Sequence, residues 1–73
     1  MENEQLSLKI GKKIRLLREY KEFSQEDLAI KSKMGIPSIS IIERGKANPT
    51  LHSLNQIANA LEVDISELFN FTI

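Results

Sequence analysis

The sequence predicts an all-α domain built from five short helices. Apolar residues recur at helical spacing along almost the whole 73-residue chain, and no alternating pattern typical of strands competes with them. Polar capping residues, glycines and prolines interrupt this pattern at short intervals, which predicts tight connections. No linker, low-complexity tract or internal repeat divides the chain, so residues 1–73 are expected to form a single domain.

The first helix is expected from about Leu6 to Lys21, with one apolar stripe facing the core. The members of this stripe are Leu6, Ile10, Ile14 and Leu17, whereas Leu8 and Leu16 fall outside it. A second, short helix follows Ser24, which is a predicted N-cap because acceptors and negative charge occupy the next turn. Its inward residues are expected to be Leu28, Ala29 and Ser32.

The third helix follows a break of only three or four residues around Lys33 to Gly35. Pro37 fits only the first turn of a helix, where its missing N–H is harmless. Gly45 is expected to end this helix. A connection this short predicts a helix-turn-helix over about residues 24–44.

Two further helices complete the predicted fold. Asn48-Pro49 marks a loop, and Thr50 is the predicted N-cap of a fourth helix. The inner face of that helix is expected to be Leu54, Ile57, Ala58 and Leu61. Asp64 and Glu67 have the spacing of a D-x-x-E capping pair and are expected to open a fifth helix from Ile65 to about Phe69.

A helical-wheel projection of the third helix places Ile36, Ile39 and Ile42 on a buried stripe, with Glu43 inside it. A buried carboxylate is costly unless it is paired, so we expect an Arg18–Glu43 ion pair that joins the first helix to the third. The alternative is that Glu43 reaches solvent at the helix end. On the opposite, exposed face, Arg44 suits a phosphate group and Ile41 is conspicuous as an outward apolar side chain.

The charge distribution favours a polyanionic partner. The net charge is zero, but all ten basic residues lie between Lys9 and Lys46, where only five acidic residues accompany them, leaving +5. The other five acidic residues lie near the two ends, so that one part of the chain is basic. An ordinary mixed surface is the alternative interpretation.

Composition excludes several function classes. The absence of cysteine excludes disulfides, thiolate catalysis and sulfur-ligated zinc, and the single histidine, His52, gives no basis for another metal site. We therefore expect no cofactor. No apolar run approaches the roughly 20 residues of a membrane span, and the acidic, polar start of the chain is unlike a secretory signal. A cytoplasmic location is expected.

The chain resembles the Cro/CI-type (Xre-like) helix-turn-helix transcriptional regulators of prokaryotes and phages. The segments that carry the resemblance are Ile14-Arg15, Ser24-Gln25-Glu26-Asp27-Leu28-Ala29, Ile39-Ser40, Ile42-Glu43-Arg44-Gly45-Lys46, Asn48-Pro49-Thr50-Leu51, Ile57-Ala58-Asn59-Ala60-Leu61 and Leu68-Phe69. These segments follow the family's order and spacing over roughly Ile10 to Phe69, which implies the five-helix, lambda-repressor-like DNA-binding fold. Among the free-standing members, the length and the Leu-Ala-Ile-Lys-Ser run favour a restriction–modification controller over a phage repressor or an antitoxin-like repressor.

The resemblance implies a role for individual residues. The positions expected to read bases are Ile36, Pro37, Ser40 and Ile41. The positions expected to contact the DNA backbone are Gln25, Lys33, Ser38, Arg44, Lys46 and Asn48. Arg18 and Glu43 match a family ion pair, in agreement with the helical wheel.

Two features depart from the family pattern. Three of the four base-reading positions are apolar and offer no hydrogen bond to a base edge, so Ile41 is left to pack on a thymine methyl and Ser40 to form one bond. Specificity would then depend on DNA shape, or on Lys33, Arg44 and backbone groups. Lys33 also occupies a turn position that often holds glycine, where a left-handed backbone would cost on the order of 1 kcal/mol.

A homodimer on a partly palindromic operator is expected, with repression or activation through RNA polymerase and control of the protein's own gene. Two-fold dimers place recognition helices about 34 Å apart in successive major grooves. The predicted dimerisation region is about residues 61–73, with Val63, Ile65, Leu68, Phe69, Phe71 and Ile73 at the interface. The alternative is that Leu68 and Phe69 belong to the core.

Other functions are less well supported. A protein-interaction module could use the apolar outer face of the third helix, although the clustered basic residues oppose this interpretation. An enzyme is disfavoured because no nucleophile–base arrangement, carboxylate pair or phosphate-binding Gly-rich loop is recognisable. RNA recognition is also disfavoured, since the few aromatic residues do not form a stacking platform.

Overall fold

The computed structural model describes the backbone of residues 2–71 and the side chains of residues 5–71. In chain order the elements are α1 (Glu2–Tyr20), α2 (Gln25–Ser32), α3 (Ile36–Glu43), α4 (Leu51–Leu61) and a 3₁₀-helix, η1 (Ile65–Phe69). The fold is therefore all-helical over the part of the chain that is described. The fifth predicted helix is a short 3₁₀-helix, so the number of α-helices in this part is four rather than five.

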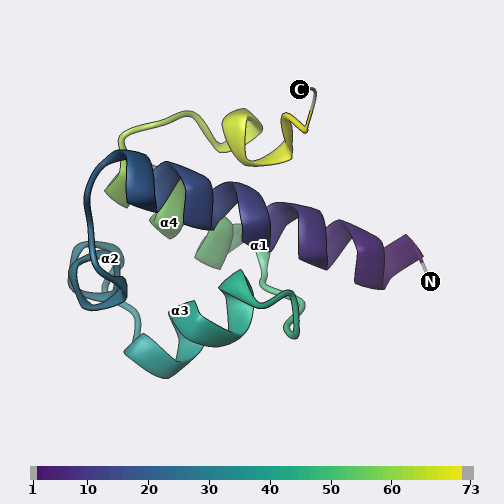
Figure 1. Cartoon of the computed structure of the whole chain (residues 1–73), viewed down its shortest axis with the longest axis horizontal. Helices are drawn as coiled ribbons and strands as arrows, with labels where there is room; N and C mark the ends of the chain where they lie inside the picture. The colour runs from purple at the N-terminus through teal and green to yellow at the C-terminus, as the bar shows by residue number, and fades with distance from the viewer. Residues whose placement is uncertain (1, 72–73) are drawn as a thin grey trace.

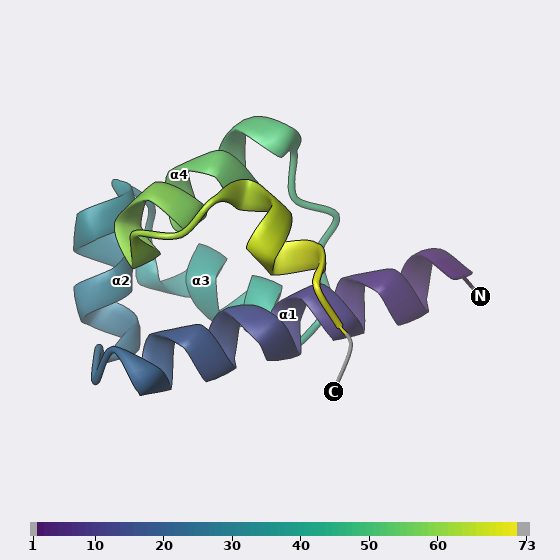
Figure 2. The same cartoon turned by 90° about the horizontal axis from the view of Figure 1, so that it is seen from above.

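The long α1 helix packs against α3, α4 and η1 (Figure 1). It contacts α3 on one side and η1 on the other, while α2 packs against both α3 and α4. Figure 2 shows α4 and η1 together above α1, with the last described residues returning to the side of α1. The two parts of the helix-turn-helix, α2 and α3, are thereby left at one end and one side of the domain.

The predicted start of α1 is wrong by one turn, because the helix begins at Glu2 rather than at Leu6. Its N-terminal turns extend past the other helices (Figures 1 and 2). As a result Leu6 is 44% exposed, and the buried stripe of α1 begins at Ile10 and continues with Ile14. Leu17 is half-buried and packs against the same core.

Polar N-caps begin three helical elements at the predicted residues, although the Glu67 side chain pairs with Lys13 instead of completing a capping pair with Asp64. At α2, Ser24 and Asp27 form a reciprocal capping box, with both hydrogen bonds at 2.9 Å. The backbone N–H of Ser53 donates to the side chain of Thr50 at 3.0 Å at the start of α4. At η1 the Asp64 carboxylate accepts from the backbone N–H of Ser66.

One core joins all five elements. Its largest fully buried side chains are Ile14, Leu28, Ile39, Ile57, Leu61 and Leu68. The predicted inner faces of α2 and α4 are confirmed, and the buried residues of α3 are Ile39, Ile42 and Glu43. The prediction that Ile36 belongs to the buried stripe is wrong. Ile36 is 43% exposed, because the core covers α3 only from Ile39 onward and Ile36 lies in the first turn, at the edge.

Candidate nucleic-acid interface

The outer face of α3 presents the four residues expected to read bases. Pro37 is exposed, Ile36 and Ile41 are 43% and 38% exposed, and Ser40 is half-buried. An α-helix with this much of its length free on one side can enter the major groove of B-DNA. The exposed surface of α3 thus has an apolar centre with one hydroxyl beside it.

Basic residues lie at both ends of this face. Lys33 precedes α3, Arg44 ends it, and Lys46 follows, and all three side chains are exposed. The Arg44 guanidinium folds back along the helix, with Nε donating to the Ser40 carbonyl at 3.3 Å. Between residues 33 and 50 the one acidic residue is Glu43, which is buried and paired. The apolar face therefore has positively charged side chains at both ends, and the one acidic side chain in this segment is already paired.

The N-terminus of α3 adds a partial positive charge. Gly35 is its N-cap and supplies no side-chain hydrogen bond to the first turn, and Pro37 needs no partner because it lacks an N–H. The backbone N–H groups of the first turn, those of Ile36 and Ser38, belong to the end of the helix dipole that favours anions. This end of α3 is suited to a DNA phosphate.

The Arg18–Glu43 ion pair is present and holds α3 in place. Arg18 Nε donates to Glu43 Oε2 at 2.6 Å, and Nη2 donates to Oε1 at 3.1 Å. Arg18 Nη1 also donates to the Phe23 carbonyl at 2.7 Å, which ties the α1–α2 turn to the pair. The hydrogen bond to Glu43 raises the pKa of Arg18, so the guanidinium is charged at all ordinary pH values.

Gln25 connects α2 to the same network. Its Nε2 donates to Glu43 Oε1 at 3.0 Å. An amide nitrogen carries two hydrogens, so Gln25 can donate the second one to a phosphate while it keeps this bond. The sequence predicted the phosphate contact but not the bond to Glu43, which fixes the orientation of the amide.

Residues of α1 position the loop between α3 and α4, where Lys46 and Asn48 lie. Ser7 Oγ donates to Asn48 Oδ1 at 3.3 Å. Gly45 has φ +72°, and a Cβ at this position would lie 2.8 Å from the Leu8 backbone. This role of Ser7 and Leu8 was not predicted, because nothing in their spacing indicates contact with a loop that lies 41 residues from Ser7 at Asn48.

Gly11 allows α1 and α3 to approach closely, which was also not predicted. A Cβ on Gly11 would collide with the Ile42 carbonyl oxygen and lie 2.7 Å from that of Glu43. The C-terminal turn of α3 therefore rests directly on the α1 backbone. A glycine inside a predicted helix was the available signal, since such glycines often mark a close approach.

The C-terminal segment, from Val63 onward, contains the residues of the predicted dimer interface, and one of them is buried. Leu68 is fully buried in the core, because η1 turns it toward α1 and α4, so it cannot contact a second subunit. Phe69 is 39% exposed, while Val63, Ile65 and Phe71 are half-buried against the core. Ile73 lies outside the described residues.

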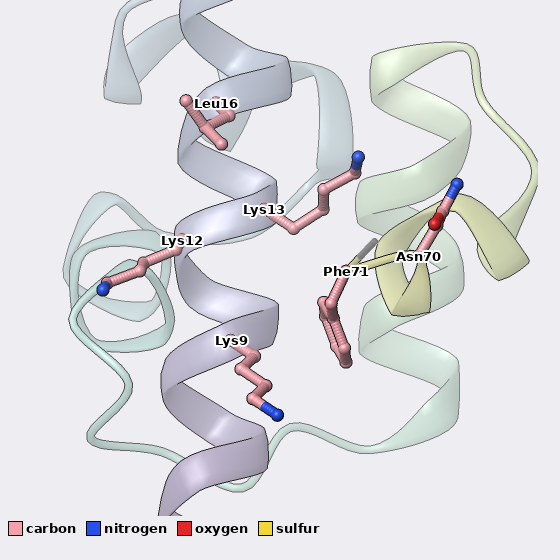
Figure 3. A pocket seen from close by; sticks show the side chains of 6 residues that line it. All are labelled: Lys9, Lys12, Lys13, Leu16, Asn70 and Phe71. Atoms are coloured by element: carbon pink, nitrogen blue, oxygen red, sulfur yellow. The ribbon is translucent and has the colours of Figure 1, made fainter. Parts of the chain in front are cut away.

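A shallow pocket of about 260 Å³ lies between α1 and this segment (Figure 3). Its lining consists of Lys9, Lys12, Lys13, Leu16, Asn70 and Phe71. Lys9 Nζ lies 5.7 Å from the centre of the Phe71 ring, and Lys13 Nζ lies 3.4 Å from Glu67 Oε1. These contacts hold the C-terminal segment against α1.

A model of the helix-turn-helix family matches residues 14–68. The chain belongs to this helix-turn-helix family. The match includes α2, α3 and the connection between them, which is the part of the fold that carries the exposed apolar face and its basic flanks. It also includes Arg18 and Glu43.

Relatives of this helix-turn-helix protein are regulators and control proteins. It is 40% identical over 62 residues to the HTH-type transcriptional regulator SlrR of Bacillus subtilis, spanning 84% of this chain but only 41% of SlrR. It is 38% identical over 68 residues to the control protein C.BamHI of Bacillus amyloliquefaciens, spanning 92% of this chain and 84% of that protein. The match to the control protein thus extends over nearly the full length of both chains.

The fold of this helix-turn-helix protein is similar to that of a restriction–modification controller protein. The crystal structure of C.AhdI from Aeromonas hydrophila matches with a TM-score of 0.85 and 36% identity, covering 86% of this chain and 96% of that chain. None of these relatives is named as an enzyme. Among residues 2–71, no helix combines the length and apolarity that crossing a bilayer requires.

Proposed function

We propose that this protein is a sequence-specific, double-stranded DNA-binding transcriptional regulator. The observation that carries the proposal is the exposed apolar face of α3, framed by Lys33, Arg44 and Lys46 and held by the Arg18–Glu43 pair. Positive charge at both ends suits the two phosphate backbones beside a major groove. The similarity to control proteins and transcriptional regulators supports the same conclusion.

In this proposal each group of residues has one task. Ile36, Pro37, Ser40 and Ile41 face the base edges. The groups that contact phosphates are Gln25, Lys33, Ser38, Arg44, Lys46 and Asn48. Phosphate contacts set the position of the domain on DNA, and base contacts set the sequence that it prefers.

The regulator is proposed to act as a homodimer on a partly palindromic operator. Of the predicted interface residues, Val63, Ile65, Phe69 and Phe71 retain exposed surface, with Phe69 the most exposed of the large side chains. Pairing these segments across a two-fold axis would cover apolar surface and present two α3 helices to successive major grooves about 34 Å apart.

Regulation would follow from occupancy of the operator. A dimer bound over a promoter blocks RNA polymerase, and a dimer bound upstream can contact the polymerase and activate transcription. The likeness to controller proteins favours control of the protein's own gene in a restriction–modification operon. Such a regulator would act in the cytoplasm, at the nucleoid, without a metal or cofactor.

A gel-shift titration tests this proposal. The probe is the DNA immediately upstream of the protein's gene, and the competitor is an excess of unrelated duplex. A sharp shift that survives the competitor supports the proposal. Equal, weak binding to both DNAs would contradict it and would favour a protein partner for the apolar face of α3.

Sedimentation analysis tests the dimer separately. Replacing Phe69 by lysine should yield a folded monomer with weakened operator binding, because a charge at the centre of the interface disfavours pairing. Leu51→Lys is the matched control, since Leu51 is 71% exposed on α4 and outside the proposed interface. A Phe69→Lys protein that remains dimeric would contradict this interface.

A further inference from the structure

The base-facing surface of α3 has an unusual chemistry for a helix that enters a groove. Ile36, Pro37 and Ile41 carry no side-chain donor or acceptor, although all three are exposed. Arg44, at the end of α3, donates from Nε to the Ser40 carbonyl and is the group we assign to a phosphate. Ser40 contributes one hydroxyl. The central part of this surface therefore cannot make the bidentate contacts that distinguish guanine or adenine.

One base in the major groove offers an apolar group to such a surface. Thymine is the only one of the four bases with a methyl group, on C5, at its major-groove edge, where cytosine has only a hydrogen. Covering an unpaired amino or carbonyl group with an isoleucine costs free energy, because the group loses its water without gaining a partner. Covering a methyl group is favourable. An apolar α3 face therefore prefers methyl-bearing pyrimidines, because a methyl contact is favourable and because contact with a polar group is costly.

We infer that Ile36 and Ile41 are specificity-determining residues that read the C5-methyl groups of pyrimidines, so that each operator half-site carries thymines opposite them. This inference rests on the proposed function and adds the chemical class of the sites that are bound. The flanking Lys33, Arg44 and Lys46 select DNA as the occupant of this face, because an apolar protein surface would leave three cations without partners.

The distance between Ile36 and Ile41 along α3 sets the expected spacing of the methyl groups. Five residues separate Ile36 from Ile41, which corresponds to about 7.5 Å along the helix at 1.5 Å per residue. Base pairs in B-DNA are stacked about 3.4 Å apart. The two contacted methyl groups of a half-site are thus expected about two base-pair steps apart along the groove and, because five residues turn about 140° around α3, beside different sides of the helix.

The test removes single methyl groups from DNA. Duplexes that bind the full-length protein are first enriched from a random-sequence library at fixed salt. Each thymine of the enriched sequence is then replaced by deoxyuridine, which lacks only the methyl group. Loss of one methyl contact should weaken binding about fourfold, and loss of the symmetric pair about fifteenfold. Thymines outside the α3 footprint should tolerate the replacement.

A second arm adds the methyl group to another base. At a contacted position, 5-methylcytosine paired with guanine should bind more tightly than unmodified cytosine paired with guanine. The two duplexes have the same hydrogen-bonding groups, so any gain comes from the methyl group alone. No gain at any contacted position would count against methyl reading.

Protein variants assign the effect to α3. Ile41→Ala should weaken binding to the thymine duplex. At the one position that Ile41 contacts, this variant should also bind thymine and deoxyuridine duplexes equally, which is the result expected of a double-mutant cycle. Ile30→Ala is the matched control, because Ile30 is a 69% exposed isoleucine on α2 and should leave both affinities unchanged. Circular dichroism would establish that both variants are folded.

The possible failures are distinguishable. Enriched duplexes without thymines in the α3 footprint, or equal binding of thymine and deoxyuridine duplexes, would overturn methyl reading and leave the proposed regulator function intact. No enrichment of any sequence would overturn both, and would make a protein partner the better occupant of this face.

Discussion

Arg18 and Glu43 form two hydrogen bonds, of 2.6 and 3.1 Å, that connect the last residue of α3 to the last turn of α1. The carboxylate also accepts from Gln25, and the guanidinium also donates to the Phe23 carbonyl. The side chains of the pair are only 12% and 3% exposed. This one pair therefore connects α1, the α1–α2 turn, the start of α2 and the proposed recognition helix.

Breaking this pair should destabilise the whole fold. Glu43→Ala leaves the part-buried Arg18 guanidinium without its partner, which costs up to the roughly 3–5 kcal/mol in the free energy of unfolding that is typical of a fully buried pair. The measurement is urea denaturation followed by circular dichroism. Glu19→Ala is a suitable control, because Glu19 pairs with Arg15 in solvent and such pairs contribute about 0.3–0.5 kcal/mol. Similar losses in the two variants would contradict the central role of the buried pair.

Gly11→Ala should also destabilise the protein, for a steric reason. The new methyl group would collide with the carbonyl oxygens of Ile42 and Glu43, so α3 must move away from α1. Overpacking of this kind costs typically about 1–3 kcal/mol, which exceeds the roughly 1 kcal/mol that alanine gains over glycine inside a helix. Thermal denaturation measures the difference. A higher melting temperature would show that the two helices can separate without loss.

Lys33→Gly should move stability and DNA affinity in opposite directions. Lys33 has a left-handed backbone, with φ 59°, so glycine should raise the free energy of unfolding by up to about 1 kcal/mol. Loss of the cation should reduce the salt dependence of DNA binding by about one unit of slope. The control is Glu22→Gly, which has φ 61° and carries no positive charge, and should show the stabilisation alone. Unchanged salt dependence in Lys33→Gly would remove Lys33 from the proposed interface.

Acidification should weaken the protein through its helix caps. Hydrogen bonds from Ser24 lower the pKa of Asp27, and hydrogen bonds from Ser66 lower the pKa of Asp64. A lowered pKa means that the folded state binds protons less readily than the unfolded chain. The stabilisation is complete above the ordinary aspartate pKa of about 3.9 and is lost as the pH falls through the lower, folded-state values.

Melting temperatures recorded from about pH 6 to pH 2 check this expectation. The wild-type curve should fall below about pH 4, and Asp27→Ala should flatten part of that fall because its cap no longer titrates. Identical pH dependence in the two proteins would show that the cap at Ser24 contributes nothing to acid sensitivity.

Local signals in the sequence predicted the features that depend on neighbouring residues. The Ser24 and Thr50 caps and the inner faces of α2 and α4 each depend on one or two helical turns. The Arg18–Glu43 pair could be predicted because a buried charge needs an opposite charge, and Arg18 lies beside the apolar stripe of α1.

The incorrect predictions concern how far along each helix the other elements cover its apolar side chains. Periodicity assigned Leu6 and Ile36 to buried stripes, but both lie near the beginning of a helix, where the other elements cover them only in part. Leu68 was assigned to a dimer interface, whereas η1 directs it into the core. A hydrophobic pattern specifies the face of a helix, and the extent of its coverage is set by the tertiary packing.

The salt dependence of operator binding tests the central claim that the exposed face of α3, with Lys33, Arg44 and Lys46 at its ends, is the DNA interface. We would measure fluorescence anisotropy on an enriched duplex at several salt concentrations for the wild type, Arg44→Ala and Lys9→Ala, because Lys9 lies beside Phe71 on the other side of α1. Arg44→Ala should reduce the slope of log affinity against log salt by about one per subunit, and Lys9→Ala should leave it unchanged. An unchanged slope in Arg44→Ala, or an equal loss in Lys9→Ala, would contradict the claim.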